Sequence, residues 1–153
     1  MGSHTLILGL GNVLMGDEGI GVHSIEYLRD KEIPEDVDLL DGGTGGFHLL
    51  SLFKQYDHLI LIDATISDSE PGEVKILRPR FANDFPRSLT SHDIGLKDLI
   101  QTAELLDKLP DIHLVTISIK DLRNVGIGIS ESLKDTLKEV HRAVLEILCK
   151  AKS

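Results

Sequence analysis

The sequence has little of what marks secreted, membrane-spanning or nucleic-acid-binding proteins. Its single cysteine, Cys149, cannot form an internal disulfide, and we expect it to be a small buried apolar side chain in a reducing cytoplasm. The longest apolar runs fall far short of the ~20 residues of a membrane span. The chain has 25 acidic and 16 basic residues, and its net charge of -9 opposes association with nucleic acid or anionic membranes.

The length and composition predict one domain. With 41% hydrophobic residues, a chain of 153 can bury one substantial core but is short for two domains. We therefore treat residues 1–153 as a single domain. Met1–His4 resembles vector-derived sequence and is assigned no function. The oligomeric state is left open, and a monomer is compatible with the sequence.

Apolar segments of strand type alternate with amphipathic segments of helix type along the chain. Strands are predicted at residues 5–10, 37–40, 57–63, 73–77 and 113–119, and helices at 20–31, 47–54, 92–109 and 130–150. Residues 42–46 are predicted to form a glycine-rich loop. This alternation predicts an α/β fold, a three-layer sandwich around a mostly parallel central sheet.

Carboxylates follow the first three predicted strands. Glu18 lies in the loop after the first strand, Asp41 follows the second, and Asp63 ends the third. In parallel sheets the carboxyl ends of the strands meet at one edge, where ligands bind. Three carboxylates gathered there would repel one another unless a cation, a shared proton or open solvent relieved the repulsion. A cation is the interpretation that we favour.

His92 is a candidate fourth member of this group. It is expected to open a helix, where the positive end of the helix dipole disfavours the imidazolium and keeps the ring neutral for metal binding. Two carboxylates and one imidazole suit Zn, Ni, Mn or Fe and leave positions open for water or substrate. Each acid taken alone is more often a helix cap or a solvated side chain, and His92 alone is as often a polar residue at a helix start. The argument therefore depends on the group.

Nucleotide binding is the second interpretation of the first loop. Gly9 and Gly11 resemble the start of a dinucleotide fingerprint, but Leu14 occupies the position of the third glycine. Asp17 and Glu18 also place negative charge where a pyrophosphate would lie. The comparison therefore fails at two points.

Nucleophile triads fit less well. Ser91, His92 and Asp93 are consecutive, and neighbours at a helix start cannot converge as a triad. Cys149 has no evident activating base. Metal-assisted hydrolysis is the chemistry that remains, in which the ion polarises a carbonyl or lowers the pKa of a water.

Five segments together resemble the nickel-iron hydrogenase maturation endopeptidases, which trim the hydrogenase large subunit. The similar segments, in chain order, are Gly9–Val22, Asp41–Thr44, Ile62–Ala64, Ser91–Leu96 and Gly126–Ser130. Each segment is a weak signal alone, but five in the right order are specific. Lys120 and Asp121 stand where the resemblance leads us to expect a proline and a glutamate. This difference affects what the resemblance implies about the rim of the site near these residues and about which hydrogenase is the partner.

The resemblance implies roles for individual residues and a phosphorylase/hydrolase-like fold. It implies metal binding by Glu18, Asp63 and His92, catalysis by Asp41, Glu18 and Asp63, and substrate binding by Gly42, Gly43 and Thr44. The metal implied is nickel, delivered in the substrate, and zinc or cadmium is expected to be able to occupy the site in vitro. The catalytic base is not assigned.

The activity implied is that of a metal-dependent endopeptidase, of a family also classed as aspartic-type. Such an enzyme removes the C-terminal extension of the hydrogenase large-subunit precursor after nickel insertion and thereby activates the hydrogenase. The alternative from another class is a module that binds a metal or nucleotide without cutting a peptide. A relative of the germination proteases is a third possibility, although nothing in the sequence points to spore proteins as substrates.

Overall fold

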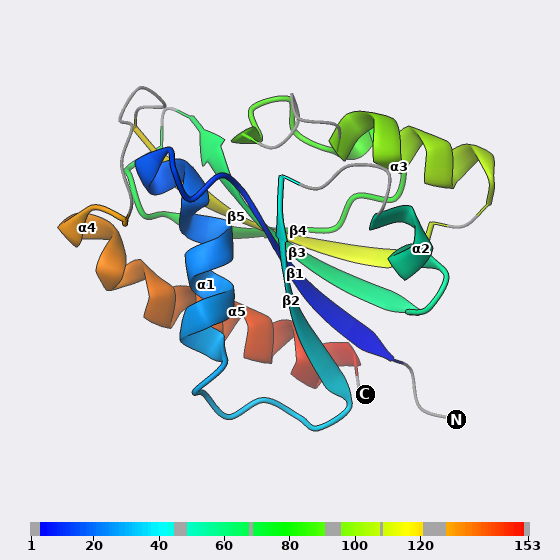
Figure 1. Cartoon of the computed structure of the whole chain (residues 1–153), viewed down its shortest axis with the longest axis horizontal. Helices are drawn as coiled ribbons and strands as arrows, with labels where there is room; N and C mark the ends of the chain where they lie inside the picture. The colour runs from blue at the N-terminus through cyan, green and yellow to red at the C-terminus, as the bar shows by residue number, and fades with distance from the viewer. Residues whose placement is uncertain are drawn as a thin grey trace.

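A five-stranded sheet forms the centre of the protein, seen in a computed structural model that describes residues 4–44, 49–67, 69–90, 96–107, 109–120 and 128–151 (Figure 1). The strand order is β2-β1-β3-β5-β4, and only β4 runs antiparallel to its neighbour. The strands are β1 (Thr5–Leu10), β2 (Val37–Gly43), β3 (His58–Ile66), β4 (Val74–Leu77) and β5 (Asp111–Ile119).

Helices cover both faces of this sheet, so the predicted three-layer α/β fold is confirmed. One face carries α1 (Ile20–Leu28), α4 (Glu131–Lys134) and α5 (Thr136–Ala151), and the other carries α2 (Leu50–Phe53) and α3 (Leu96–Leu105). Two 3-10 turns, η1 (Gly16–Gly19) and η3 (Ala82–Asp84), lie in the connections. Among the described helices, none is long and apolar enough to cross a bilayer.

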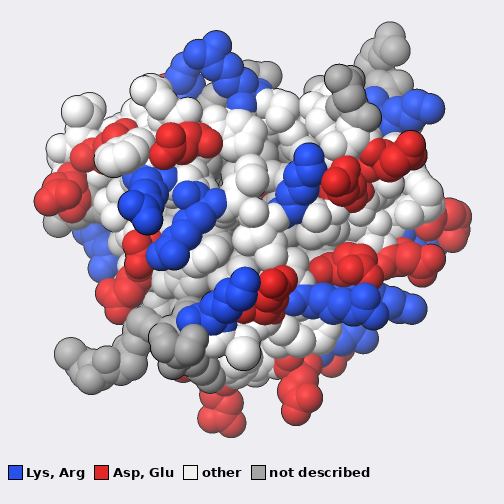
Figure 2. All heavy atoms as spheres, turned by 180° about the vertical axis from the view of Figure 1, so that it is seen from behind, with Lys and Arg blue, Asp and Glu red and all other residues white. Residues whose placement is uncertain are grey.

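The alternation of side chains along the central strands builds two cores. In β1, Ile7 packs on the α1 and α5 side, whereas Leu6 and Leu8 pack on the α2 and α3 side. Because both faces are covered, all six β1 residues are buried. Figure 2 shows acidic and basic side chains interspersed on the surface of the rear face, whereas Asp63 is buried.

Two strands extend beyond their predicted ends. We predicted that β3 would stop at Asp63, but it continues to Ile66 because β5 pairs with it over its whole length and Leu89 bridges Thr65 on its other side. Strand β2 continues to Gly43 through an irregularity in its pairing with β1, where a loop was predicted. Asp63 therefore lies within β3, which pairs with β5 and, at Thr65, with the segment that contains Leu89.

The C-terminal helix differs from prediction in two respects. The single helix predicted at residues 130–150 is divided at Asp135 into α4 and α5. Cys149, expected to be buried, is exposed. The helical repeat explains this, since Val144, Ile147 and Leu148 face the sheet and the next position turns toward solvent.

Glycine at position 21 lets α1 approach the sheet closely. A Cβ atom on Gly21 would lie 2.2 Å from the Leu10 carbonyl oxygen and 2.4 Å from that of Ile62. Gly9 is equally tight, since its Cβ would lie 2.3 Å from the Gly21 carbonyl oxygen. Both contacts involve backbone atoms, which cannot rotate away as a side chain can. The start of α1 is therefore held against β1 and β3.

We predict that Gly21→Ala destabilises the protein by roughly 3 kcal/mol, the upper end of the cost of overpacking, because two backbone carbonyls must move. Urea denaturation followed by circular dichroism measures the loss. Ser132→Ala, at an exposed position, serves as the control and should change the free energy of unfolding by less than about 0.5 kcal/mol. Equal stability of the two variants would refute the role given to this contact.

Candidate functional site

At the carboxyl ends of the neighbouring strands β1 and β3, the chain turns toward opposite faces of the sheet. From β1 the chain passes to α1 on one face and returns as β2, whereas from β3 it passes toward α3 on the other face and returns as β5 (Figure 1). A crevice forms where two such connections diverge, and ligands bind there in open α/β sheets. The loops after β1 and β3 are therefore the segments in which to look for functional side chains.

Glu18 lies on one side of this crevice, in the turn η1 just before α1. This turn contacts β3 as well as α1. Gly11 permits the tight packing of the loop, since it has a φ of 138° and a Cβ there would lie 2.3 Å from the Glu18 carbonyl oxygen. Partial burial raises the pKa of the Glu18 carboxyl. A neighbouring cation would offset that effect.

Asp17, next to Glu18, joins this turn to the C-terminal part of the chain. Its two carboxylate oxygens accept hydrogen bonds from the Ser130 backbone N–H and the Ser130 hydroxyl, both at 2.7 Å. Ser130 immediately precedes α4, so the contact links segments 113 residues apart. Paired hydrogen bonds to one carboxylate fix its orientation. The clamp formed by Asp17 and Ser130 thus holds the backbone that carries Glu18.

Asp63 lies on the other side of the crevice and is fully buried, with 0% of its surface exposed. Its Oδ1 atom accepts hydrogen bonds from the Ala64 backbone N–H at 2.9 Å and the Thr90 hydroxyl at 3.0 Å. A buried carboxylate needs such partners, because leaving it unsatisfied would be costly. Residues 88–90 reach it because Thr65 and Leu89 form an antiparallel bridge.

Asp41 occupies a different setting from Asp63. It is exposed on the edge strand β2, and its Oδ1 accepts the Gly43 backbone N–H at 2.8 Å. Strand β1 separates β2 from β3, and the Gly11 N–H donates to the Gly43 carbonyl at 2.9 Å, tying the two loops together. Asp41, Gly43 and Thr44 line a hollow of 210 Å³ that also contacts the first loop. Gly42 is half-buried between Asp41 and Gly43.

The structure describes two of the three predicted metal ligands, Glu18 and Asp63. The loop carrying Glu18 and the strand carrying Asp63 meet at one crevice, but His92 lies outside the described residues, as do its neighbours 91–95. Among the residues that the structure describes, no three histidine, cysteine, aspartate or glutamate side chains are grouped closely enough to hold a metal ion. The ligand set of Glu18, Asp63 and His92 therefore stays a prediction.

Three supporting residues were missed by the sequence analysis. Thr90 holds Asp63, and the contact between Asp17 and Ser130 holds the turn with Glu18. Asp17 was considered only as negative charge opposed to a phosphate, and Ser130 only as part of a similar segment. Nothing in the sequence indicates that positions 63 and 90, or 17 and 130, lie together, because the intervening chain passes through helices and strands.

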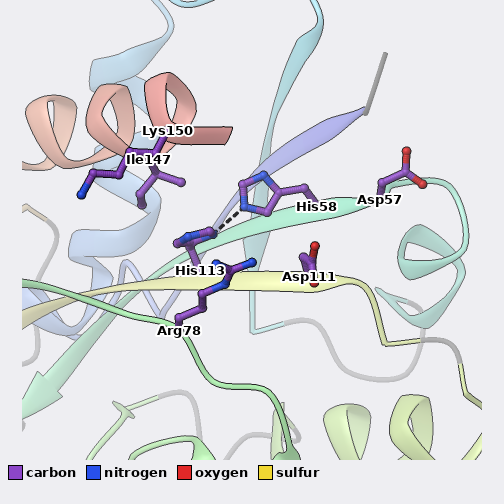
Figure 3. A pocket seen from close by; sticks show the side chains of 7 residues that line it. All are labelled: Asp57, His58, Arg78, Asp111, His113, Ile147 and Lys150. Carbon is purple, nitrogen blue, oxygen red and sulfur yellow. Dashed lines mark hydrogen bonds between the residues drawn. The ribbon is translucent and has the colours of Figure 1, made fainter. Parts of the chain in front are cut away.

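Two histidines assigned no function share a pocket at the opposite, amino end of the sheet (Figure 3). His58 on β3 and His113 on β5 are joined by a hydrogen bond of 2.7 Å between Nε2 and Nδ1. The pocket measures 370 Å³ and is lined also by Asp57, Asp111 and Arg78. Burial lowers the pKa of both rings, that of His113 to about 4, with the neighbouring histidine adding to the effect there. The pair is therefore neutral at pH 7.

Comparison with known proteins shows one consistent likeness. Residues 22–147 match the model of a family described as hydrogenase maturation protease. A similar curated protein is the hydrogenase expression/formation protein HupD of Bradyrhizobium diazoefficiens, 36% identical over 139 residues that cover 86% of this chain and 71% of that protein.

Two matches from Escherichia coli extend this likeness to fold. The hydrogenase 2 maturation protease is 33% identical over 146 residues, which cover 94% of this chain and 89% of that protein. The solved structure of the hydrogenase maturating endopeptidase HybD superposes with a TM-score of 0.85 at 32% identity, covering 97% of this chain and 93% of that one. Sequence and fold thus agree over nearly the whole chain.

We predict that Thr90→Val destabilises the protein by about 1–3 kcal/mol, because the buried Asp63 carboxylate then loses the hydroxyl that donates to its Oδ1. Valine keeps the shape of threonine and removes only the hydroxyl. Thr90→Ser restores the donor and should recover most of the loss. Chemical denaturation compares the three proteins, and a valine variant as stable as the wild type would contradict the assigned contact.

We also predict that the free energy of unfolding decreases as the pH falls from 6.5 toward 4. In that range the unfolded chain protonates His113, whose ordinary pKa is 6.5, while the folded pKa of about 4 keeps the ring neutral. Between pH 6.5 and 4 the unfolded state thus binds more protons than the folded state. The contribution of His113 to the free energy of unfolding is therefore fully present above pH 6.5 and is lost as the pH falls toward 4. His113→Gln should flatten this dependence in urea titrations, and identical slopes in both proteins would disprove the explanation.

Proposed function

Because this chain belongs to the hydrogenase maturation protease family, we propose that it removes the C-terminal extension of a nickel-iron hydrogenase large-subunit precursor after nickel has been inserted. Family membership makes the chain a peptide hydrolase of hydrogenase processing. The timing, the position of the cut and the sensing of nickel are our proposals. The observation that supports them most is the meeting of the turn with Glu18 and the strand with Asp63 at one crevice.

Nickel enters this proposal as part of the substrate. Glu18, Asp63 and His92 bind the nickel held by the precursor, so that a precursor without nickel lacks part of the recognised surface. Two carboxylates and one imidazole leave coordination positions for the precursor's own ligands. A cation stabilises the charged form of the partly buried Glu18, whose pKa is raised by burial. Zinc or cadmium could fill the same positions in vitro.

The peptide to be cut lies along the end of β2 in this proposal. Asp41, Gly42, Gly43 and Thr44 bind it, since all four lie where β2 meets the first loop. The hollow of 210 Å³ beside Asp41 offers room for one substrate side chain. The Gly43 φ of 52° and the half-buried glycines there allow another backbone to approach.

Cleavage adds water across one peptide bond, giving a new carboxylate on the mature subunit and a free amine on the released extension. Asp41, Glu18 and Asp63 are the residues assigned to this step, with the general base left unassigned among them. A carboxylate of raised pKa suits proton transfer near neutral pH, and Glu18 has that property. We place the reaction in the cytoplasm, with the precursor as the protein partner and a monomer as the acting species.

We predict that the purified chain cleaves nickel-loaded precursor and leaves nickel-free precursor intact. His92→Ala and Glu18→Gln should each lower the initial rate at least ~100-fold while the far-ultraviolet circular dichroism spectrum stays unchanged, since ligands that bind a metal in the reacting complex have large effects. Gel mobility and intact mass of the large subunit measure the cleavage.

Glu26→Gln, on the exposed side of α1, is the matched control and should cleave at the wild-type rate. Cleavage of both precursors at equal rates would exclude nickel sensing. Cleavage of neither, combined with binding of a divalent cation or nucleotide in calorimetry, would instead favour a binding module without peptidase activity.

A further inference from the structure

A second hollow, of 220 Å³, lies at the carboxyl ends of β3 and β5, next to β4. Asp63 pairs across the sheet with Thr116, and Thr65 pairs with Ser118, so these four side chains project from the same face. Paired positions on neighbouring strands are about 5 Å apart. The hollow therefore lies on the sheet face that carries Asp63, and the backbone of its lining residue Thr116 is one strand spacing from that of Asp63.

Hydroxyl groups supply most of its polar lining. The polar residues that line it are Thr65, Ser67, Lys75, Ser88, Thr116 and Ser118. Thr65 and Ser88 are hydrogen-bonded to each other at 2.6 Å, and Ser67 and Ser118 at 3.1 Å. In each pair one hydroxyl donates, which leaves the hydrogen of the other available to a further acceptor. The lining can thus donate several hydrogen bonds.

Thr116 adds a further hydroxyl to the lining of the hollow. Although only 3% of its residue surface is exposed, its hydroxyl is not among the fully enclosed polar atoms that lack a hydrogen-bond partner, so it is reached from the hollow. A hydroxyl that faces a hollow can donate to an acceptor bound there.

The charge of the residues that line the hollow indicates which kind of ligand it can bind. Among the described residues that line the hollow, Lys75 is the one that carries a charge, in a chain whose net charge is -9. It is the cross-strand partner of Thr116, and its ammonium lies 3.4 Å from the Ser69 hydroxyl. An ammonium beside several hydroxyl donors, with no carboxylate among the described residues of the lining itself, is suited to an anion rather than a cation.

We propose that this hollow binds a carboxylate of the precursor, carried by the segment next to the bond that is cut. Lys75 pairs with the carboxylate, and Thr116 donates to it from the floor of the hollow. The inference rests on the proposed function, because it makes the hollow a subsite of the same crevice. Its consequence is that the enzyme selects precursors with an acidic side chain or the chain terminus at that point.

Kinetics of cleavage test the subsite. We expect Lys75→Met and Thr116→Val each to raise KM for the nickel-loaded precursor about three- to tenfold, with kcat changed less than twofold, since the contact is a partly exposed charge-assisted one. Lys75→Arg should restore most of the affinity. Lys54→Met, an exposed lysine after α2 at the other end of the sheet, is the control and should match the wild type.

Binding of synthetic peptides separates the sources of the carboxylate and does not depend on cleavage. Peptides spanning the precursor C-terminus are compared as the natural acid, as the C-terminal amide, and with aspartate and glutamate replaced by asparagine and glutamine. We expect one replacement to weaken peptide binding to the wild type but not to Lys75→Met. The Thr116 NMR signals should shift with the natural peptide and with the modified peptide that keeps the bound carboxylate, but not with the peptide that lacks it. Whichever replacement does so identifies the terminal or the side-chain carboxylate.

The two experiments fail independently of the proposed function. A wild-type enzyme that cleaves, with KM unchanged in Lys75→Met and Thr116→Val, overturns the subsite and leaves the peptidase in place. Carboxylate-dependent peptide binding in a chain that never cleaves the precursor supports the subsite and refutes the peptidase. Equal binding of all three peptides, with no Thr116 shift, also overturns the subsite.

Discussion

The structure depends on the close contact between the first turn of α1 and the carboxyl ends of β1 and β3. Gly21 meets the carbonyl oxygens of Leu10 and Ile62 at distances that no side chain would allow, and Gly9 meets Gly21 in return. This contact decides where the preceding turn lies and therefore brings Glu18 to the strand that carries Asp63. The crevice is thus a result of backbone packing, and the carboxylates occupy places which that packing creates.

Buried polar side chains are concentrated at one end of the sheet face that carries Asp63. Thr65, Thr116 and Ser118 share that end, and Thr90 approaches it from the segment after β4. At the amino end, the buried polar group is a neutral pair of histidines that hydrogen-bond to each other. The polar group at the carboxyl end, in contrast, combines the Asp63 carboxyl group with several hydroxyl donors, which are groups that can bind an ionic ligand.

The sequence predicted the layers of the fold well because its signals are local. Apolar runs such as that in β1 and the helical repeat in α5 depend on neighbouring residues. The strand ends and the supporting contacts were missed because they depend on distant partners. Asp63 lies inside β3 only because β5 and Leu89 extend the pairing, and Thr90 meets Asp63 only after the intervening chain has folded. The residues of the candidate site were predicted from carboxylates at the ends of strands and from the family resemblance, and their roles stay predictions.

The contact between Asp17 and Ser130 has a consequence for synthesis of the protein on the ribosome. The turn that carries Glu18 emerges early, but the serine that fixes it lies 113 residues later, just before the last helices. A nascent chain can pair β1 with β2 and β3 well before that serine leaves the exit tunnel. The turn that carries Glu18 therefore lacks the Asp17–Ser130 clamp until residue 130 has left the exit tunnel, however early β1, β2 and β3 pair.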